Sequence, residues 1–490
     1  MLDGLPNRIV VWAALATAVT ATTAAPAAAQ DIPYHNYLVG DRALGLGGAF
    51  VGLADDAAAT FHNPAGLAVL PDTSISASFW VVAFNHRKVE QGWVSPQGSS
   101  DLRDNEFTSP PLVVTAVAKI GKSDPLGRKR HAIGLALLKP LRLRYRYTVA
   151  AQRGDPSALS TFDVIHSDQA RWYGVSYSYD TRCGVSYGVT GFLSFRSLRH
   201  EEIEIHAVNG PPTPSPDALD VTRHSNFHAS LTHVVWRLGV LWTPSPSLRL
   251  GAMAQLPGWA LSGDASNREV TVDLVDDNGT TSQVERIEHR FLTASRPIPL
   301  ELRFGGTWYP NARSLITADI TVHGPAGSRD APVQLIDSTG VPQPRFLAME
   351  TYLGPSIRAA IGGETFATDR IPVRGGLMAY RSGLPDVPRE SDRFTASDLN
   401  TVGASFSVGW ILSGGHELSF GAAGTYAWGT GSALDQTDLD TATYLSTPVT
   451  ETTVLVFMSG GKRAFKRLAR RLYNEGQKLI RRGQGWLDEE

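Results

Sequence analysis

The stretch Gly415–Gly429, GHELSFGAAGTYAWG, alternates with a period of two between an apolar and a more polar face. The first face carries His416, Leu418, Phe420, Ala422, Tyr426 and Trp428. The second face carries Glu417, Ser419, Gly421, Ala423 and Thr425. Successive side chains of a β-strand point to opposite faces, so this period predicts a strand. An apolar face with aromatic residues near the strand ends is typical of a lipid-facing barrel strand.

The same alternation recurs in Asn400–Trp410, Val185–Phe195, Leu300–Trp308 and Ile316–Val322. In hydrocarbon every backbone polar group must be paired, so such strands have to close into a cylinder. A soluble β-sandwich is the alternative, because its strands also alternate. We favour the barrel because the strands extend over about ten residues or more, which suits a tilted spanning strand.

We expect an all-β, 14-stranded antiparallel transmembrane β-barrel. Short connections alternate with long ones, which is typical of outer-membrane barrels and places both ends of the barrel in the periplasm. Prolines interrupt two of the ranges, 286–309 and 346–365, and two strands in each would raise the count to sixteen. The expected strands are 74–84, 111–120, 131–147, 169–179, 183–198, 227–243, 247–261, 286–309, 314–323, 346–365, 371–381, 399–412, 416–429 and 450–458.

The composition narrows the class of protein further. The chain has 490 residues and a formal net charge of −2, which gives no reason to expect nucleic acid. Residues 1–29 combine Arg8, an apolar run and a small-residue cleavage site, so they predict a signal peptide. Cys183 is the only cysteine, which excludes an internal disulfide and a thiolate metal site.

Residues 30–73 lie between the signal peptide and the first strand, and they are rich in glycine and apolar residues. We expect this segment to fold into the lumen as a plug, because glycine lets its backbone approach wall side chains closely. Asp55 or Asp56 is predicted to cap a short helix over 57–61. Asn63, Pro64, Ala65 and Gly66 would end that helix in a turn.

Gly45, Gly47 and Gly48 do not form a nucleotide-binding motif, because Phe50 stands where the last glycine of G-x-G-x-x-G would be. The adjacent carboxylates at 55–56 have no further ligands nearby in the sequence. We therefore expect no metal and no cofactor.

The stretch Arg42–Ala68, RALGLGGAFVGLADDAAATFHNPAGLA, resembles the N-terminal hatch of the FadL-type outer-membrane transporters (OMPP1/FadL/TodX), which carry long-chain fatty acids or aromatic hydrocarbons. Thr307–Val322, TWYPNARSLITADITV, is similar to a strand, turn and strand of the same family. The resemblance implies fourteen strands, a hatch and the outer membrane of a Gram-negative bacterium. A related group of barrels shares the hatch and serves protein export, so both functions stay open.

The resemblance also implies a route. Family members take substrate from outside into a lumenal pocket and release it through a gap at a kink in the third strand. Here the third strand, His131–Tyr147, contains Pro140, which cannot donate a ladder hydrogen bond and marks a bulge or break. We expect Leu138, Pro140 and Leu141 to border the opening. A tolerated bulge without a role in transport is the alternative.

Substrate contacts are expected for Phe50, Phe61 and Leu67 of the plug, with packing against the wall as the alternative. The predicted partner is a hydrophobic small molecule, with outer-membrane lipid around the barrel.

Arg142, Arg144 and Arg146 share one face of the third strand. Facing the lumen, they would pair a substrate carboxylate or form salt bridges. Near the outer rim they would instead contact lipopolysaccharide.

The chain continues beyond the predicted barrel, 74–458, as a basic amphipathic helical tail over 459–490. It would lie in the periplasm, against anionic lipid or a periplasmic partner, or form a dispensable extension. The tail makes the last aromatic residue of the barrel, Phe457, internal. The barrel assembly machinery is an expected partner of this last strand during insertion.

No G-x-S-x-G elbow occurs in the sequence, so an enzyme is not expected. A lipase remains the alternative, because a catalytic triad is assembled in space and not along the sequence.

Overall fold

A computed structural model describes most of the chain between residues 39 and 462. The predicted signal peptide and the tail beyond residue 462 lie outside the described residues. The described residues are 39–70, 73–95, 98–109, 113–123, 129–152, 158–208, 219–275, 283–292, 298–327, 335–336, 342–343, 352–384, 386–391, 397–412, 416–435, 437 and 443–462.

The main sheet closes into a barrel. It contains 18 strands among the described residues, and each member of a ring of fourteen pairs antiparallel with the next, the last with the first. The ring confirms the predicted closed cylinder. Its strands are β1 (Ser74–Ser95), β3 (Val114–Ser123), β4 (Lys129–Gln152), β5 (Ala158–Asp180), β6 (Val185–Val208), β7 (Leu219–Ser245), β8 (Leu248–Gln255), β11 (Glu301–Asn311), β12 (Ser314–His323), β17 (Ser356–Thr368), β18 (Ile371–Arg381), β20 (Asp398–Ile411), β21 (His416–Asp435) and β22 (Thr443–Lys462).

The sheet as a whole has more strands than the predicted fourteen, because four of its strands lie outside the ring. They are β2 (Gly98–Thr108), β9 (Trp259–Val275), β10 (Gln283–Leu292) and β19 (Glu390–Ser391). Two small ladders, β13 (Ala326–Gly327) with β16 (Tyr352–Leu353) and β14 (Leu335–Ile336) with β15 (Pro342–Gln343), are separate from this sheet. One short contact, between β1 and β21, is parallel.

Several predicted loops are extended hairpins. The predicted loop 148–168 is the paired outer part of β4 and β5, and 199–226 is mostly that of β6 and β7. Predicted strand 247–261 is two strands, and so is 286–309. Alternation continues beyond the apolar band in these segments, so the ladder continues where polarity alone suggested a loop.

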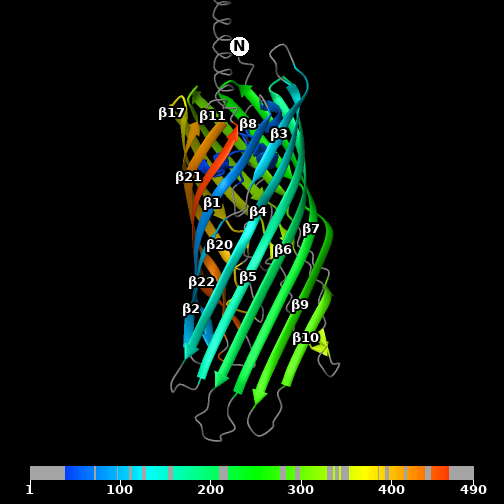
Figure 1. Ribbon diagram of the computed structural model, residues 1–490, viewed down its shortest axis with the longest axis vertical. Helices are drawn as coiled ribbons and strands as arrows, with labels where there is room; N and C mark the ends of the chain where they lie inside the picture. Colours follow the sequence, from blue (N-terminus) through cyan, green and yellow to red (C-terminus); the bar gives the residue numbers. More distant parts are fainter. Residues whose placement is uncertain are drawn as a thin grey trace, which may run out of the picture.

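One wall of the barrel is much taller than the rest. In Figure 1 β5, β6, β7, β9 and β10 continue below the remainder of the sheet. The short turns lie at the opposite end, as between β7 and β8. Short turns face the periplasm in outer-membrane barrels, so the tall wall faces outward.

Exposure alternates along the spanning strands. On β4 the outward-facing Ile133, Leu135 and Leu137 are 40%, 57% and 48% exposed, whereas Ala132 and Ala136 are buried. Similar residues on the neighbouring strands form a continuous apolar outer band, including Tyr173, Val175, Leu238, Phe304, Phe406 and Phe420. This outer band, on a closed sheet, is the surface of an outer-membrane barrel.

The described helices are short and all belong to the N-terminal segment, which we define as residues 39–70. In the part of the chain that is described, no helix has the length and apolar character needed to cross a membrane. The described helices are α2 (Asp41–Gly45), α3 (Ala59–His62) and α4 (Gly66–Val69).

Candidate functional site

The N-terminal segment is enclosed by the barrel wall, and its backbone is hydrogen-bonded to strands far apart in the ring. The Gly47 amide donates to Ser405 Oγ of β20 at 3.0 Å. On another side of the ring, Arg249 Nη1 of β8 donates to the Leu53 carbonyl at 2.8 Å. Figure 1 shows the segment in dark blue within the short-turn end of the barrel. We define the lower lumen as the interior at this short-turn, periplasmic end, which is drawn at the top of Figure 1. The N-terminal segment fills it.

Glycines of this segment lie where the wall is closest. Gly47 and Gly48 have φ of +66° and +91°, a region that side chains with a Cβ rarely adopt. A Cβ on Gly47 would lie 2.8 Å from the Leu377 carbonyl oxygen. A Cβ on Gly45 would lie 2.2 Å from Ser407 Oγ of β20, and one on Gly66 would lie 1.9 Å from the Ala54 carbonyl oxygen of the segment itself. Glycine at these positions therefore allows the segment to pack closely against the wall and against itself.

The two adjacent aspartates have different partners. Asp55 is ion-paired with Arg42, which also donates to Glu364 of β17, from Nε to Oε2 at 3.1 Å and from Nη2 to Oε1 at 3.2 Å. Glu364 in turn pairs with Arg374 Nε of β18 at 2.7 Å. Asp56 accepts a hydrogen bond from the Ala58 amide at 2.7 Å, just before α3. The charged network thus ties the segment to the wall, while Asp56 orders the turn that leads into α3.

Asp56 is also poised to titrate. Burial, followed by repulsion from Asp41, raises the pKa of its carboxyl to about 7. Since the Arg42 guanidinium and the Ala58 amide favour the charged form but only partly offset burial, the pKa of this carboxyl stays near neutral pH.

The Asn-Pro-Ala turn contacts both its own segment and the wall. Asn63 Nδ2 donates to the carbonyls of Val51 and Val240, each at 3.0 Å. Pro64 presses against Gly188 of β6, where a Cβ would lie 2.3 Å from the proline carbonyl carbon. The turn therefore fits a wall position that has no side chain.

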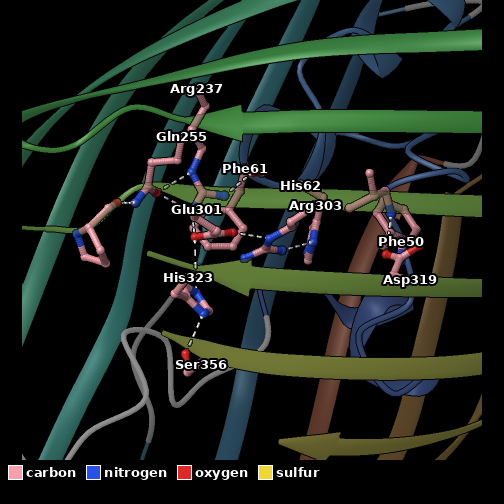
Figure 2. A network of polar contacts seen from close by, with 12 residues as sticks. Phe50, Phe61, His62, Arg237, Gln255, Glu301, Arg303, Asp319, His323 and Ser356 are labelled. Atoms are coloured by element: carbon pink, nitrogen blue, oxygen red, sulfur yellow. Dashed lines mark hydrogen bonds and ion pairs between the residues drawn. The ribbon is translucent and has the colours of Figure 1, made fainter. Parts of the chain in front are cut away.

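A second network lies deeper in the lower lumen and is drawn in Figure 2. Arg237 of β7 is fully buried and bonds Gln255 Oε1, from Nε at 3.0 Å and from Nη2 at 2.7 Å. Its Nη2 also pairs with Glu301 Oε2 at 3.2 Å, and its Nη1 donates to the Phe61 carbonyl. Arg303 pairs with the other oxygen of Glu301. Each buried charge in this group has an opposite charge or a carbonyl beside it, as burial requires.

His62 joins this network as a neutral ring. Burial, and next the Arg303 guanidinium, hold the pKa of His62 well below its usual value. Arg303 Nη1 lies 3.3 Å from Nδ1, and the Val39 carbonyl lies 2.7 Å from Nε2. Since arginine can only donate and a carbonyl can only accept, the proton is assigned to Nε2.

The three plug residues predicted to touch substrate are all tightly packed. Phe50 packs with Tyr309 and Leu315. Leu67 packs with apolar residues of β3 and β4. Phe61 lies under the Arg237 guanidinium, 3.8 Å from its carbon to the ring centroid. Phe61 alone of the three borders the cluster that contains Leu138 and Leu141.

The β4 ladder is irregular at Pro140. Leu138 pairs with Trp172 and Leu141 with Ala170, so β4 has one extra residue there relative to β5. On its other side, the β3 ladder ends at Leu137. Both leucines are 4% exposed and lie in the same apolar cluster. The bulge thus lies where the described pairing on one side of β4 stops.

We define the outer lumen as the barrel interior at the end away from the short turns. It contains an aromatic pocket. Its apolar floor includes Tyr145, Tyr147 and Phe162, all nearly buried. Two charged residues, Arg87 and Glu202, also line the pocket. Arg87 pairs with Glu451 at 3.2 Å, and its guanidinium carbon lies 4.8 Å from the centroid of the Tyr145 ring. The full lining is Arg87, Val89, Gly92, Leu102, Tyr145, Tyr147, Phe162, Val164, Glu202, Ser397, Ser432, Leu434 and Tyr444.

Leu143 connects the pocket with the bulge. It packs against the cluster that holds Leu138 and Leu141, and also against the cluster that holds Tyr145 and Phe162. The sequence did not single out this leucine or the pocket. Its signal was the alternation Leu141, Leu143, Tyr145 and Tyr147 on a single strand face.

The chain was compared with known proteins. No protein-family model matches it, and neither does any curated protein. Solved structures do match. The crystal structure of a Pseudomonas aeruginosa FadL homologue has a TM-score of 0.58 at 15% identity, with 89% of this chain and 100% of that chain covered. The P. putida toluene transporter TodX has 0.57 at 13%, with 88% and 99% covered. The Ralstonia pickettii toluene transporter TbuX has 0.52 at 13%, with 88% and 99% covered.

The chain has the FadL fold. This likeness confirms the family resemblance expected from the hatch at the level of architecture. It also agrees with the outer-membrane location given by the apolar band.

On the FadL-fold barrel the three arginines of β4 point away from the lumen. Arg144 and Arg146 have half or more of their side chains exposed, whereas Tyr145 between them is buried. The bulge reverses the face parity of β4. Both lumenal interpretations of these arginines are therefore wrong, and the outer-rim interpretation is the one that fits their position.

A serine, a histidine and a glutamate meet in the lumen of this FadL-fold barrel, as Figure 2 shows. His323 Nδ1 lies 3.0 Å from Ser356 Oγ, but its Nε2 lies 3.7 Å from Glu301, beyond hydrogen-bond distance. Glu301 is already paired with Arg237 and Arg303. The glutamate therefore does not orient the histidine as a catalytic triad requires. Among the described residues, no group of three or more His, Cys, Asp or Glu could hold a metal ion.

Proposed function

We propose that this barrel is an outer-membrane channel for passive uptake of hydrophobic molecules, such as long-chain fatty acids or aromatic hydrocarbons. The observation that carries the proposal is the apolar packing along β4 from the aromatic pocket through Leu143 to the bulge at Pro140. The structural neighbours add support, since two of them are described as toluene transporters.

Lateral release suits such a solute. An alkyl chain gains about 0.8 kcal/mol for each CH₂ removed from water. Release into the periplasm would forfeit that gain, whereas release into the bilayer keeps it. We propose that Leu138, Pro140 and Leu141 border the exit, because β4 has an extra residue there and the described β3 pairing ends beside it.

The N-terminal segment would act as the hatch. It fills the lower lumen with buried ion pairs and close backbone contacts. A path straight through the barrel would require these contacts to break, so the segment supports a sideways exit. We propose that Phe61 meets a solute at the bulge, because it belongs to the apolar cluster that contains Leu138 and Leu141.

The pocket must widen to receive its solute. It encloses about 30 Å³, whereas a cavity of about 150 Å³ holds benzene. Tyr145, Tyr147 and Phe162 would have to move apart. Aromatic side chains at the mouth of a β-barrel are typical of a ligand site of this kind.

The test is uptake of labelled oleate and labelled toluene by a Gram-negative host that lacks its own transporters, with and without this chain. We expect uptake with the chain, and at least a tenfold loss in Pro140→Val. Pro310→Val, at an exposed position beside a short turn, is the matched control and should transport normally. Normal uptake through Pro140→Val would rule out the bulge as the exit.

The export interpretation gives different results in the same experiment. A barrel that serves protein export would fold and insert, yet restore uptake of neither solute. It would also co-purify with a large secretion partner, whereas a channel would retain lipid in its lumen.

A further inference from the structure

The outer face of the tall wall carries a group of basic side chains, separate from the lumen. Four come from β4, one of them from its bulge, and one each comes from β5 and β6. Arg144, Arg146 and Arg199 are 50%, 57% and 54% exposed. The basic patch consists of Lys139, Arg142, Arg144, Arg146, Arg171 and Arg199.

The strand register brings these residues together. Arg144 pairs with Ser167, and Ser167 pairs with Arg199, so the two arginines share a row two strands apart. Neighbouring strands are spaced about 4.8 Å, which separates their backbones by about 10 Å. At the bulge, Arg142 and Arg171 are the charged neighbours of Lys139. The patch is therefore one continuous surface.

The patch begins where the apolar band ends. Arg171 is directly across from Phe195, and Phe195 contacts Tyr173 at 5.8 Å between ring centroids. Both rings are nearly half exposed, as is Trp236 on β7. Aromatic residues at this height form the girdle of an outer-membrane barrel. The cations consequently lie at the level of lipid headgroups.

Carboxylates balance only part of this charge. Glu106 lies 3.9 Å from both Arg142 and Arg144, and Asp163 lies 3.2 Å from Arg146. Asp104 and Glu201 are the other nearby carboxylates. Among the described residues, six cations thus face four anions. Within the described part of the chain, Lys139 and Arg171 have no carboxylate at ion-pair distance.

We propose that this basic patch binds the phosphate groups of lipopolysaccharide in the outer leaflet. Arginine presents a planar fork that matches phosphate, and partly desolvated sites at a headgroup level strengthen such contacts. The lipid chains would lie along the apolar band below, beside Tyr173 and Phe195. This proposal does not depend on the transport proposal.

The test compares lipopolysaccharide binding by the full barrel and by Arg144→Gln/Arg171→Gln. Arg182→Gln/Arg313→Gln, at the opposite end of the barrel, is the matched control, and Arg171→Gln alone is a milder variant. The readouts are lipopolysaccharide retained per barrel and affinity for vesicles that contain it. Heat-modifiable migration verifies folding of each variant.

We expect at least a tenfold weaker affinity in the double variant, a smaller loss in the single one, and none in the control. Dephosphorylated lipopolysaccharide, phosphatidylglycerol vesicles and inorganic phosphate should each bind the natural protein more weakly. Unchanged affinity in the folded double variant would overturn the proposal. Equal binding of dephosphorylated lipopolysaccharide or of phosphatidylglycerol would overturn it as well.

Discussion

The lower and outer parts of the lumen share one barrel wall but differ in what occupies them. The lower lumen is lined by buried charges such as Glu364, Arg374 and Arg237, and the N-terminal segment fills it. The outer lumen contains the pocket, whose aromatic floor of Tyr145, Tyr147 and Phe162 is bordered by Arg87 and Glu202. The nature of the occupant explains the difference. A chain segment brings backbone polar groups that need partners, whereas a hydrophobic solute brings none.

Removing one charge from the lower lumen should have the largest effect on stability. Arg42→Met leaves Asp55 and Glu364 buried without their shared cation. Breaking a buried ion pair in this way costs about 3–5 kcal/mol. We expect early release of the N-terminal segment, measured by denaturant unfolding in micelles and by limited proteolysis.

Arg313→Met is the control for that experiment. Arg313 forms an exposed pair with Asp369 at a short turn, and such pairs contribute at most about 1 kcal/mol. Equal losses in the two variants would show that the buried network does not hold the segment.

The second prediction adds a methyl group where hatch and wall touch. In Gly188→Ala the new Cβ would lie 2.3 Å from the Pro64 carbonyl carbon. Overpacking of this kind costs about 1–3 kcal/mol, so proteolysis of the segment should become faster. In Gly363→Ala the nearest atom is the Leu315 oxygen at 3.7 Å, and we expect no change. Equal sensitivity of both variants would contradict the fit.

The third prediction concerns the outer lumen and its link to the bulge. Leu143→Asn places an amide between the two apolar clusters and should reduce solute uptake at least tenfold. Leu143→Met conserves volume and apolar character and should retain uptake. Uptake of labelled oleate or toluene by cells provides the measurement. Retained uptake in a folded Leu143→Asn barrel would show that the solute does not pass this leucine.

The smallest expected effect is a pH dependence of the lower lumen. The pKa of Asp56 is about 7 in the folded protein, above its usual value near 4. The folded state thus binds more protons between these values, so stability falls as pH rises from about 4 through 7. Because Asp56 is only partly buried, we expect a modest change. Hydrogen exchange of residues 39–70 should quicken between pH 5 and pH 8.

Asp56→Asn removes the titrating group and is the comparison for that measurement. It should make the exchange rate of the segment less dependent on pH, after correction for intrinsic exchange. The same pH dependence in Asp56→Asn would assign the effect to another group.

The alternation of apolar and polar residues predicted most of the fold. The alternation in His416–Trp428 and in Ile316–Val322 predicted spanning strands, and both lie in ring strands of the structure. It failed at the tall wall, because polar residues at 148–168 and 199–226 suggested loops. The residues there are polar because both faces of the hairpins lie outside the lipid, although the strand pairing continues.

The candidate site was only partly visible in the sequence. The glycines and Asn63 of the N-terminal segment were recognisable because a motif in consecutive residues carries its own local geometry. The different roles of Asp55 and Asp56 were not, because they depend on Arg42 and on Glu364, 322 residues away from that arginine. Leu143 was missed for a similar reason, since its two clusters come from several strands.

The sequence by itself determined the period of the strands, the closed barrel and the position of a small-residue segment before the first strand. These follow from local rules: alternate side chains face opposite sides, and hydrocarbon tolerates no unpaired backbone. Only the tertiary structure decided which face of β4 looks inward after Pro140. One extra residue in a ladder reverses every later side chain, and that insertion exists only relative to the neighbouring strand. This reversal places the arginines outside and the tyrosines in the pocket.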